Sequence, residues 1–247
     1  NIESVVISGA VDVPRDMFGK CTGLKKVTLK NGVRSIGEDA FRDCSSLESV
    51  IFENTVLEKI SDGAFWGCSA LSSIALPDSV TEIEKYAFFE TGLRNIQLPE
   101  KLTLIGAYAF CNCKNLKQVQ LPSQLKELGD GAFSGCENLA QIQLPSQLNK
   151  LGGDAFRDCT SLDKIDIPAG LKQIESGTYC NTGLTSVTLH EGLTKIEDWA
   201  FHDCLKLKKI RIPKSVTNIG GLALGIRYNR ENGAEEVIPG GFTVEGY

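Results

Sequence analysis

The hydrophobic positions of this chain recur with a period of about 23 residues. Each copy contains a small residue followed by an aromatic one, and the copies fall at Met17-Phe18, Ala40-Phe41, Ala64-Phe65, Ala87-Phe88, Ala109-Phe110, Ala132-Phe133, Ala155-Phe156, Thr178-Tyr179 and Ala200-Phe201. A degenerate copy follows at Ala223-Leu224. A period in the twenties, held over almost the whole chain, is typical of architectures in which each repeat forms one turn of a solenoid.

Within each copy the pattern predicts a strand, a bend and a turn. The strand is indicated by alternating apolar and polar residues, as in Val119-x-Leu121. A proline should end that strand in six copies, because it has no amide hydrogen for a sheet: Pro77, Pro99, Pro122, Pro145, Pro168 and Pro213. A second apolar pair, such as Leu125 and Leu128, precedes a glycine that suits a tight bend. The segment before the aromatic, such as 38–41, predicts one helical or 3₁₀ turn.

A single copy cannot bury enough apolar surface to fold alone, so the copies must stack. We therefore predict an α/β fold: a curved, right-handed leucine-rich-repeat solenoid of about ten coils over residues 1–224. Its parallel sheet should form the concave face and its helical or 3₁₀ turns the outer face. Residues 225–247 hold no full copy, and we expect a degenerate C-terminal cap or the start of a following segment.

The repeat resembles the BspA-type leucine-rich repeat. The segment 93–116 carries this resemblance at Leu93, Ile96, Leu98, Pro99, Leu102, Ile105, Gly106, Ala109, Phe110, Cys113 and Leu116. The resemblance covers about residues 2–224, and its Ala-Phe-x-x-Cys ending is specific. It implies an exported, surface-exposed protein of the kind found in gut and oral bacteria and some protozoan parasites. It also implies adhesion to a host or bacterial surface macromolecule, and it carries over no catalytic residue.

Aromatic and cysteine side chains are predicted to form two internal columns. The aromatic column contains Phe41, Phe65, Phe88, Phe110, Phe133 and Phe156, and the cysteine column contains Cys44, Cys68, Cys113, Cys136 and Cys159, extended by Cys21 and Cys204. Threonine replaces cysteine at Thr91 and Thr182, which favours small, buried, weakly donating side chains over chemistry. Disulfides between neighbouring coils remain the alternative. Cys111 and Cys180 lie off the column, and we expect them nearer to solvent.

Composition and charge exclude several classes of function. The net charge is -5, and no basic stripe appears, so nucleic acid is not expected as a partner. No apolar run approaches the roughly 18 residues of a membrane span, and no leader sequence begins at Asn1. No Cys-x-x-Cys pair is present, and the sequence predicts neither a metal site nor a cofactor.

The search for catalytic chemistry centres on two histidines, His190 and His202. The run His202-Asp203-Cys204 contains a nucleophile and a base. However, Cys204 belongs to the inward column, and His202 follows an inward Phe201 and should face out as a solvated histidine. A nucleophile and its base must be within hydrogen-bond reach. The sequence therefore predicts no enzyme.

Two surfaces are candidate binding sites. Side-chain amides are expected on the outer face of the predicted sheet at Asn95, Gln97, Gln118, Gln120, Gln141 and Gln143. They could bind a protein or a glycan, or they could stack on one another as a self-satisfied ladder. Trp66 and Phe89 share one repeat position and could form a contact surface or pack on neighbouring loops. The leading hypothesis is a non-catalytic, secreted or cell-surface binding module, and the alternative is a stalk that presents another domain.

Overall fold

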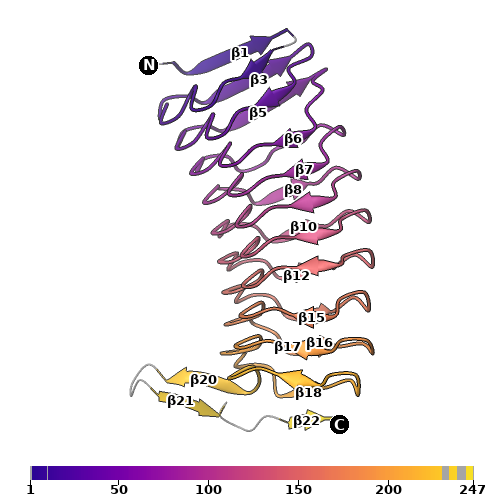
Figure 1. Cartoon of the computed structure of the whole chain (residues 1–247). Coiled ribbons are helices and arrows are strands. Elements are labelled where there is room, and N and C mark those ends of the chain that lie inside the picture. Colours follow the sequence, from indigo (N-terminus) through magenta and orange to yellow (C-terminus); the bar gives the residue numbers. More distant parts are fainter. Residues whose placement is uncertain (1, 10, 230–233, 238–242, 247) are drawn as a thin grey trace.

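In the computed structural model, which describes residues 2–9, 11–229, 234–237 and 243–246, the chain forms an elongated stack of coils. Figure 1 shows β1 at one end of the stack and β22 at the other. The first row of strands contains β1 (Ser4–Ser8), β3 (Lys26–Lys30), β5 (Ser49–Glu53), β8 (Asn95–Gln97), β10 (Gln118–Gln120), β12 (Gln141–Ile142), β14 (Lys164–Asp166), β16 (Ser186–Thr188), β18 (Lys209–Arg211) and β22 (Thr243–Glu245).

A second row of strands runs along another side of the stack. It contains β2 (Asp12–Val13), β4 (Ser35–Ile36), β6 (Lys59–Ile60), β7 (Glu82–Ile83), β9 (Leu104–Ile105), β11 (Glu127–Leu128), β13 (Lys150–Leu151), β15 (Gln173–Ile174), β17 (Lys195–Ile196) and β19 (Asn218–Ile219). The sequence pattern did not predict these strands, because two residues are too few to show an alternation. The ten second-row strands are joined by nine full turns of the chain, so the solenoid has about nine turns.

The strand registers confirm that neighbouring coils are one sequence repeat apart. Strand β10 pairs in parallel with β8 and β12, and Gln118 lies opposite both Asn95 and Gln141. In the second row, Leu128 lies opposite Ile105 and Leu151. The predicted parallel, leucine-rich-repeat solenoid is therefore correct at this level.

The predicted helical turns are wrong, and with them the α/β class. Within the described part of the chain there is no helix. Alternate amides of the turn segment bind the next coil: the Phe41 N–H donates to the Ala64 carbonyl at 3.0 Å. The Arg42 N–H instead stays within its coil and donates to the Asp39 carbonyl at 3.0 Å. A helix would keep these amides for itself, whereas the solenoid uses half of them to join coils.

This alternation requires left-handed backbone at two positions in most turns. Asp39 and Asp43 have φ values of 55° and 56°. Asp, Asn and Gly occupy these positions in most coils, because they adopt positive φ at the lowest cost. The same positions in two central coils hold Tyr86 (φ 54°) and Tyr108 (φ 56°), bulky residues for which this conformation is strained.

The core is a stack of aromatic rings flanked by aliphatic side chains. Nine rings stack from Phe18 to Phe201, with centroids 5.2–5.8 Å apart and interplanar angles of at most 11°. The rings from Phe41 to Phe201 are fully buried. Each ring covers the open side of the ring below, so every coil completes the core of its neighbours.

Glycines after the second-row strands permit close contact between coils. A Cβ on Gly129 would lie 2.5 Å from the Ala107 amide nitrogen, and one on Gly106 would lie 2.7 Å from the Lys85 amide nitrogen. Neither glycine has positive φ. The predicted tight bend is therefore not the reason for glycine here; the backbone of the preceding coil occupies the space that a side chain would need.

The predicted C-terminal cap, residues 225–247, falls partly on residues 230–233, 238–242 and 247, which lie outside the described residues. Of the remainder, β20 (Ile226–Asn229) and β21 (Ala234–Val237) form an antiparallel pair, and β22 pairs with β18 in the first row. The cap remains a prediction.

Within the ranges that the structure describes, no residues form a helix that could span a membrane.

Candidate functional site

The six predicted amides come together on the solvent side of the first row. The register of β8, β10 and β12 places them as three pairs, one pair for each coil: Asn95 and Gln97, Gln118 and Gln120, Gln141 and Gln143. All six side chains are exposed, whereas the residues between them, such as Val119, are buried in the core. This alternation follows from the pleat of a strand, which sends successive side chains to opposite faces. We call these six residues the amide face.

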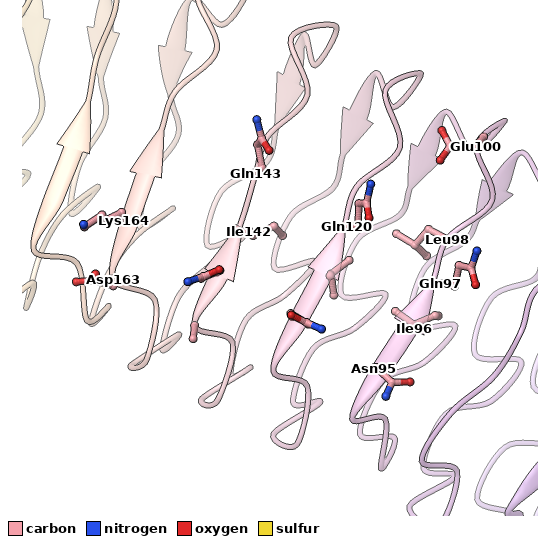
Figure 2. Close-up of a pocket in the computed structure, with 14 residues that line it drawn as sticks. Asn95, Ile96, Gln97, Leu98, Glu100, Gln120, Ile142, Gln143, Asp163 and Lys164 are labelled. Atoms are coloured by element: carbon pink, nitrogen blue, oxygen red, sulfur yellow. The ribbon is translucent and has the colours of Figure 1, made fainter.

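The amide face forms the floor of a shallow hollow of about 700 Å³. Figure 2 shows the labelled side chains of Asn95, Gln97, Gln120 and Gln143 carried by neighbouring coils. Charged residues complete the lining at its edges: Glu100, Asp163 and Lys164. Lys164 occupies the repeat position of Gln118 and Gln141, whereas nothing in the repeat marks Glu100 and Asp163 as belonging to the same surface.

A second hollow of about 520 Å³ adjoins the first where the strands end. The prolines that end three successive strands line it, at Pro122, Pro145 and Pro168. Its far end contains His190, whose Nε2 lies 2.7 Å from Oδ1 of Asp166. The sequence predicted these prolines as strand terminators, and the structure adds that they line this surface as well.

The amides do not form the self-satisfied ladder that was the alternative interpretation. Across the described residues, none of the six amide groups makes a hydrogen bond with another protein group. Each side-chain amide has one carbonyl acceptor and two N–H donors. A ligand can therefore form hydrogen bonds with these donors and acceptors without breaking any hydrogen bond within the described part of the protein.

Trp66 and Phe89, the second predicted surface, belong to a larger aromatic cluster on the turn side of the coils. Their ring centroids lie 4.7 Å apart, and Tyr86 lies 5.0 Å from Trp66. Tyr108 stacks on Tyr86 at 5.3 Å, and the Arg42 guanidinium carbon lies 3.9 Å from the centre of the Trp66 ring. The rings thus contact one another and a cation, and they are only partly exposed. The sequence missed the two tyrosines, which occupy a different repeat position.

The cysteine column joins coils through weak hydrogen bonds. The Cys113 thiol donates to the Phe88 carbonyl of the preceding coil, with 3.1 Å between sulfur and oxygen, and Cys136 donates in the same way to Phe110. In the shorter coil the Thr91 hydroxyl bonds the same Phe88 carbonyl at 3.0 Å. All nine cysteines are free thiols. Burial raises the pKa of Cys113 to about 12, so this thiol is uncharged at neutral pH.

One expectation about an individual side chain is wrong: His202 is buried, at 8% exposure, and is not a solvated histidine. Cys111 and Cys180 are slightly nearer to solvent than the buried column cysteines, as expected, but they too are buried, at 8% and 6% exposure against 0% for Cys113. The Nδ1 of His202 lies 4.0 Å from the Cys180 sulfur and 3.5 Å from Oδ2 of Asp203.

This grouping lacks the features of a catalytic pair. Burial raises the pKa of Cys180 to about 11, so the thiolate needed for nucleophilic attack is scarce. Cys204 points elsewhere, and its sulfur bonds the Tyr179 carbonyl at 3.0 Å. Among the residues that the structure describes, no group of three or more His, Cys, Asp or Glu side chains could hold a metal ion.

The repeated coils, the stacked core and the polar strand face define a leucine-rich-repeat solenoid, a class whose members are typically binding proteins and not enzymes. The sequence family described as the BspA type leucine rich repeat region matches in six copies, over residues 1–117 and 103–225. The chain therefore belongs to the BspA-type leucine-rich-repeat family, as its sequence resemblance predicted.

One solved structure shows the same fold, and a second is similar in sequence. A leucine-rich repeat protein from Bacteroides ovatus is 26% identical, with a TM-score of 0.56, covering 87% of this chain and 80% of that one. A leucine rich cell surface protein from Faecalibacterium prausnitzii is also 26% identical, with a TM-score of 0.48, covering 88% of this chain and 78% of that one. No curated protein sequence matches the chain.

Proposed function

We propose that this protein is a non-catalytic binding module that recognises a host or bacterial surface macromolecule, a protein or a glycan, through the amide face. The observation that carries the proposal is that the six amides make no hydrogen bonds with other described residues and form the floor of a hollow of about 700 Å³. Buried polar groups normally find partners, whereas these exposed ones can exchange water for a ligand.

The rigidity of the floor supports the proposal. Gln118 and Gln120 flank Val119, which is held in the core, and their strand, β10, is paired with β8 on one side and β12 on the other. A ligand that binds such a surface does not have to order it first, which reduces the entropy lost on binding. The aromatic cluster around Trp66 and Phe89 is less suitable, because its rings already contact each other and Arg42.

We further propose that the protein acts outside the cell or on its surface. Membership of a family whose proteins are typically exported supports this location. A surface location also fits a rigid, elongated module that presents one long face to its surroundings.

The test is a pair of double variants measured against an array of purified surface glycans and extracellular-matrix proteins. The double variant Gln120→Arg, Gln143→Arg should no longer bind the ligands that the wild-type protein binds, because two bulky cationic side chains fill the hollow. Gln124→Arg with Gln147→Arg is the matched control, since these exposed glutamines lie in the same coils but outside either hollow.

Thermal unfolding should be unchanged in both double variants, because exposed substitutions rarely change stability by more than about 0.5 kcal/mol. A protein that serves as a stalk would behave identically in all three forms. Equal binding by wild type and the Gln120→Arg, Gln143→Arg variant would therefore contradict the proposal.

A further inference from the structure

The amide face is a lattice with two different spacings. Neighbouring coils in a parallel sheet lie about 4.8 Å apart, and the two amides on one strand are two residues, or about 6.6 Å, apart. Gln97, Gln120 and Gln143 therefore repeat along the solenoid axis at the shorter spacing. A long ligand that follows this axis meets one amide pair for each coil.

An extended peptide does not fit this lattice along the axis. Its residues advance by about 3.3 Å, and groups on the same side repeat at about 6.6 Å, so neither value matches the spacing between coils. A peptide laid along one strand would match the longer spacing but would reach only one amide pair, because β10 contains three residues. The length of one pyranose unit in an extended glycan is, in contrast, close to the spacing between coils.

The charges around the face disfavour anionic ligands. The floor itself is uncharged, and the two hollows are edged by Glu100, Asp163 and Asp166, with Lys164 as the one lysine and with His190 bonded to Asp166. Polyanions such as nucleic acids or acidic glycans need cations to replace their counterions, which this surface does not provide. Sugar hydroxyls donate and accept hydrogen bonds, as side-chain amides do, and carboxylates at the edge can accept from them.

The proline row supplies the apolar contact that a sugar ring also needs. Pro145 and Pro168, which are partly exposed, and Pro122, which is buried, line the adjoining hollow beside Gln120 and Gln143. One side of a ligand could therefore bond the amides through its hydroxyls while its C–H groups pack against the prolines. Successive coils repeat this combination of polar and apolar surface, as a polysaccharide repeats its units.

From this geometry we propose that the ligand is an uncharged, linear glycan that lies across β8, β10, β12 and β14, with about one sugar unit for each coil. The proposal rests on the proposed function and specifies its ligand. It makes affinity depend on ligand length until the four coils are filled, since each added unit reaches another pair of polar side chains: amides on the first three coils, and Lys164 and Asp166 on the fourth.

The experiment is isothermal titration calorimetry of the full chain with cellohexaose, mannohexaose and xylohexaose. The disaccharide of each series tests the dependence on length, hexagalacturonate tests charge, and a six-residue Gly-Ser peptide tests the peptide alternative. We expect at least one neutral hexasaccharide to bind more tightly than its disaccharide, and hexagalacturonate and the peptide to bind more weakly. Gln120→Leu with Gln143→Leu should weaken binding about tenfold or more through lost hydrogen bonds. Gln124→Leu with Gln147→Leu should leave it unchanged.

Failure to bind any neutral hexasaccharide would overturn the proposal, as would preferred binding of hexagalacturonate or an affinity unaffected by Gln120→Leu with Gln143→Leu. The proposed function would survive this result if the array identified a protein ligand that the arginine double variant no longer bound. If the arginine double variant also bound every array ligand as wild type does, the glycan proposal and the proposed function would both fail.

Discussion

The first three coils and the central coils differ although they share one repeat. Strands β1, β3 and β5 have five residues each, whereas β8 and β10 have three and β12 has two. The central strands are followed by Pro99, Pro122 and Pro145, and the position equivalent to Pro122 in β3 is Lys30. The hollows lie over the central coils.

The difference indicates that proline limits the length of the central strands, although β16 is equally short with His190 at the position of the proline. Lys30 pairs with Ser8 and Glu53 in neighbouring strands, and its side chain also forms an ion pair with Glu53 at 3.0 Å. A proline in its place could not donate to this ladder. In the three central coils of β8, β10 and β12 the exposed face carries amides; in the long strands the middle column of that face carries Val6, Thr28 and Ile51.

The largest expected effect distinguishes the middle of the aromatic stack from its end. Phe110→Ala should destabilise the protein by about 3–5 kcal/mol, because a fully buried ring with a neighbour on each side leaves a cavity. Phe18→Ala should cost less, since Phe18 stacks on Phe41 alone among the described rings. Urea unfolding of both variants measures the difference, and equal losses would show that the stack is not the continuous core described.

A proline transplanted into the long strands tests the cause of their length. Lys30→Pro should lower the free energy of unfolding by about 1–3 kcal/mol, because it leaves a ladder partner unpaired. Lys30→Ala, which keeps the amide hydrogen and removes only an exposed ion pair, should cost at most about 1 kcal/mol. If denaturant unfolding gave the same loss for both, strand length would not be set by the proline.

The buried thiols of the central coils should make stability depend on pH. Burial raises the folded-state pKa of Cys113 to about 12, whereas an unfolded thiol ionises near about 8.5. The stability that comes from keeping this thiol uncharged is fully present below about pH 8.5 and is lost as the pH rises toward about 12. The loss at pH 10 amounts to about 1–2 kcal/mol for each such thiol. Cys113→Thr should reduce the loss of stability between pH 8 and pH 10 in urea titrations by this amount. An unchanged loss would mean that Cys113 does not titrate on unfolding.

The smallest effect concerns the one aromatic in the stack that carries a hydroxyl. Tyr179 is fully buried between Phe156 and Phe201, and its hydroxyl has no hydrogen-bond partner among the described atoms. Tyr179→Phe should therefore raise stability by about 1 kcal/mol, because an unsatisfied buried donor is removed. Thermal unfolding of this variant beside wild type checks it, and a lower melting temperature would show that the hydroxyl has a partner.

The repeat explains why so much of the fold could be predicted. Phe110 and Cys113 recur at a fixed spacing, and such spacing places equivalent residues in equivalent surroundings. The outer turns were not predictable in the same way. Residues 38–41 fit a helical turn locally, but their amides bind the following coil, and no local pattern reveals a partner 23 residues away.

The candidate site shows the same division. The period-two alternation sufficed to predict that Gln118 and Gln120 share a face, and the repeat sufficed to align them with Gln141 and Gln143. Whether these amides bond one another depends on side-chain conformations, which the sequence does not specify. The burial of His202 was missed because it depends on contacts with another coil, such as the approach of its Nδ1 to the Cys180 sulfur.

The sequence by itself determined the period, the parallel stacking and the residues of the internal columns, because these depend on hydrophobic patterning that repeats with the chain. Three features were decided by the tertiary structure alone. The turns are not helical, the glycines make room for the backbone of the preceding coil, and the amides on the floor of the hollow make no hydrogen bonds within the described part of the protein. Each of these depends on contacts between coils, and a coil's environment is complete only when its neighbours are in place.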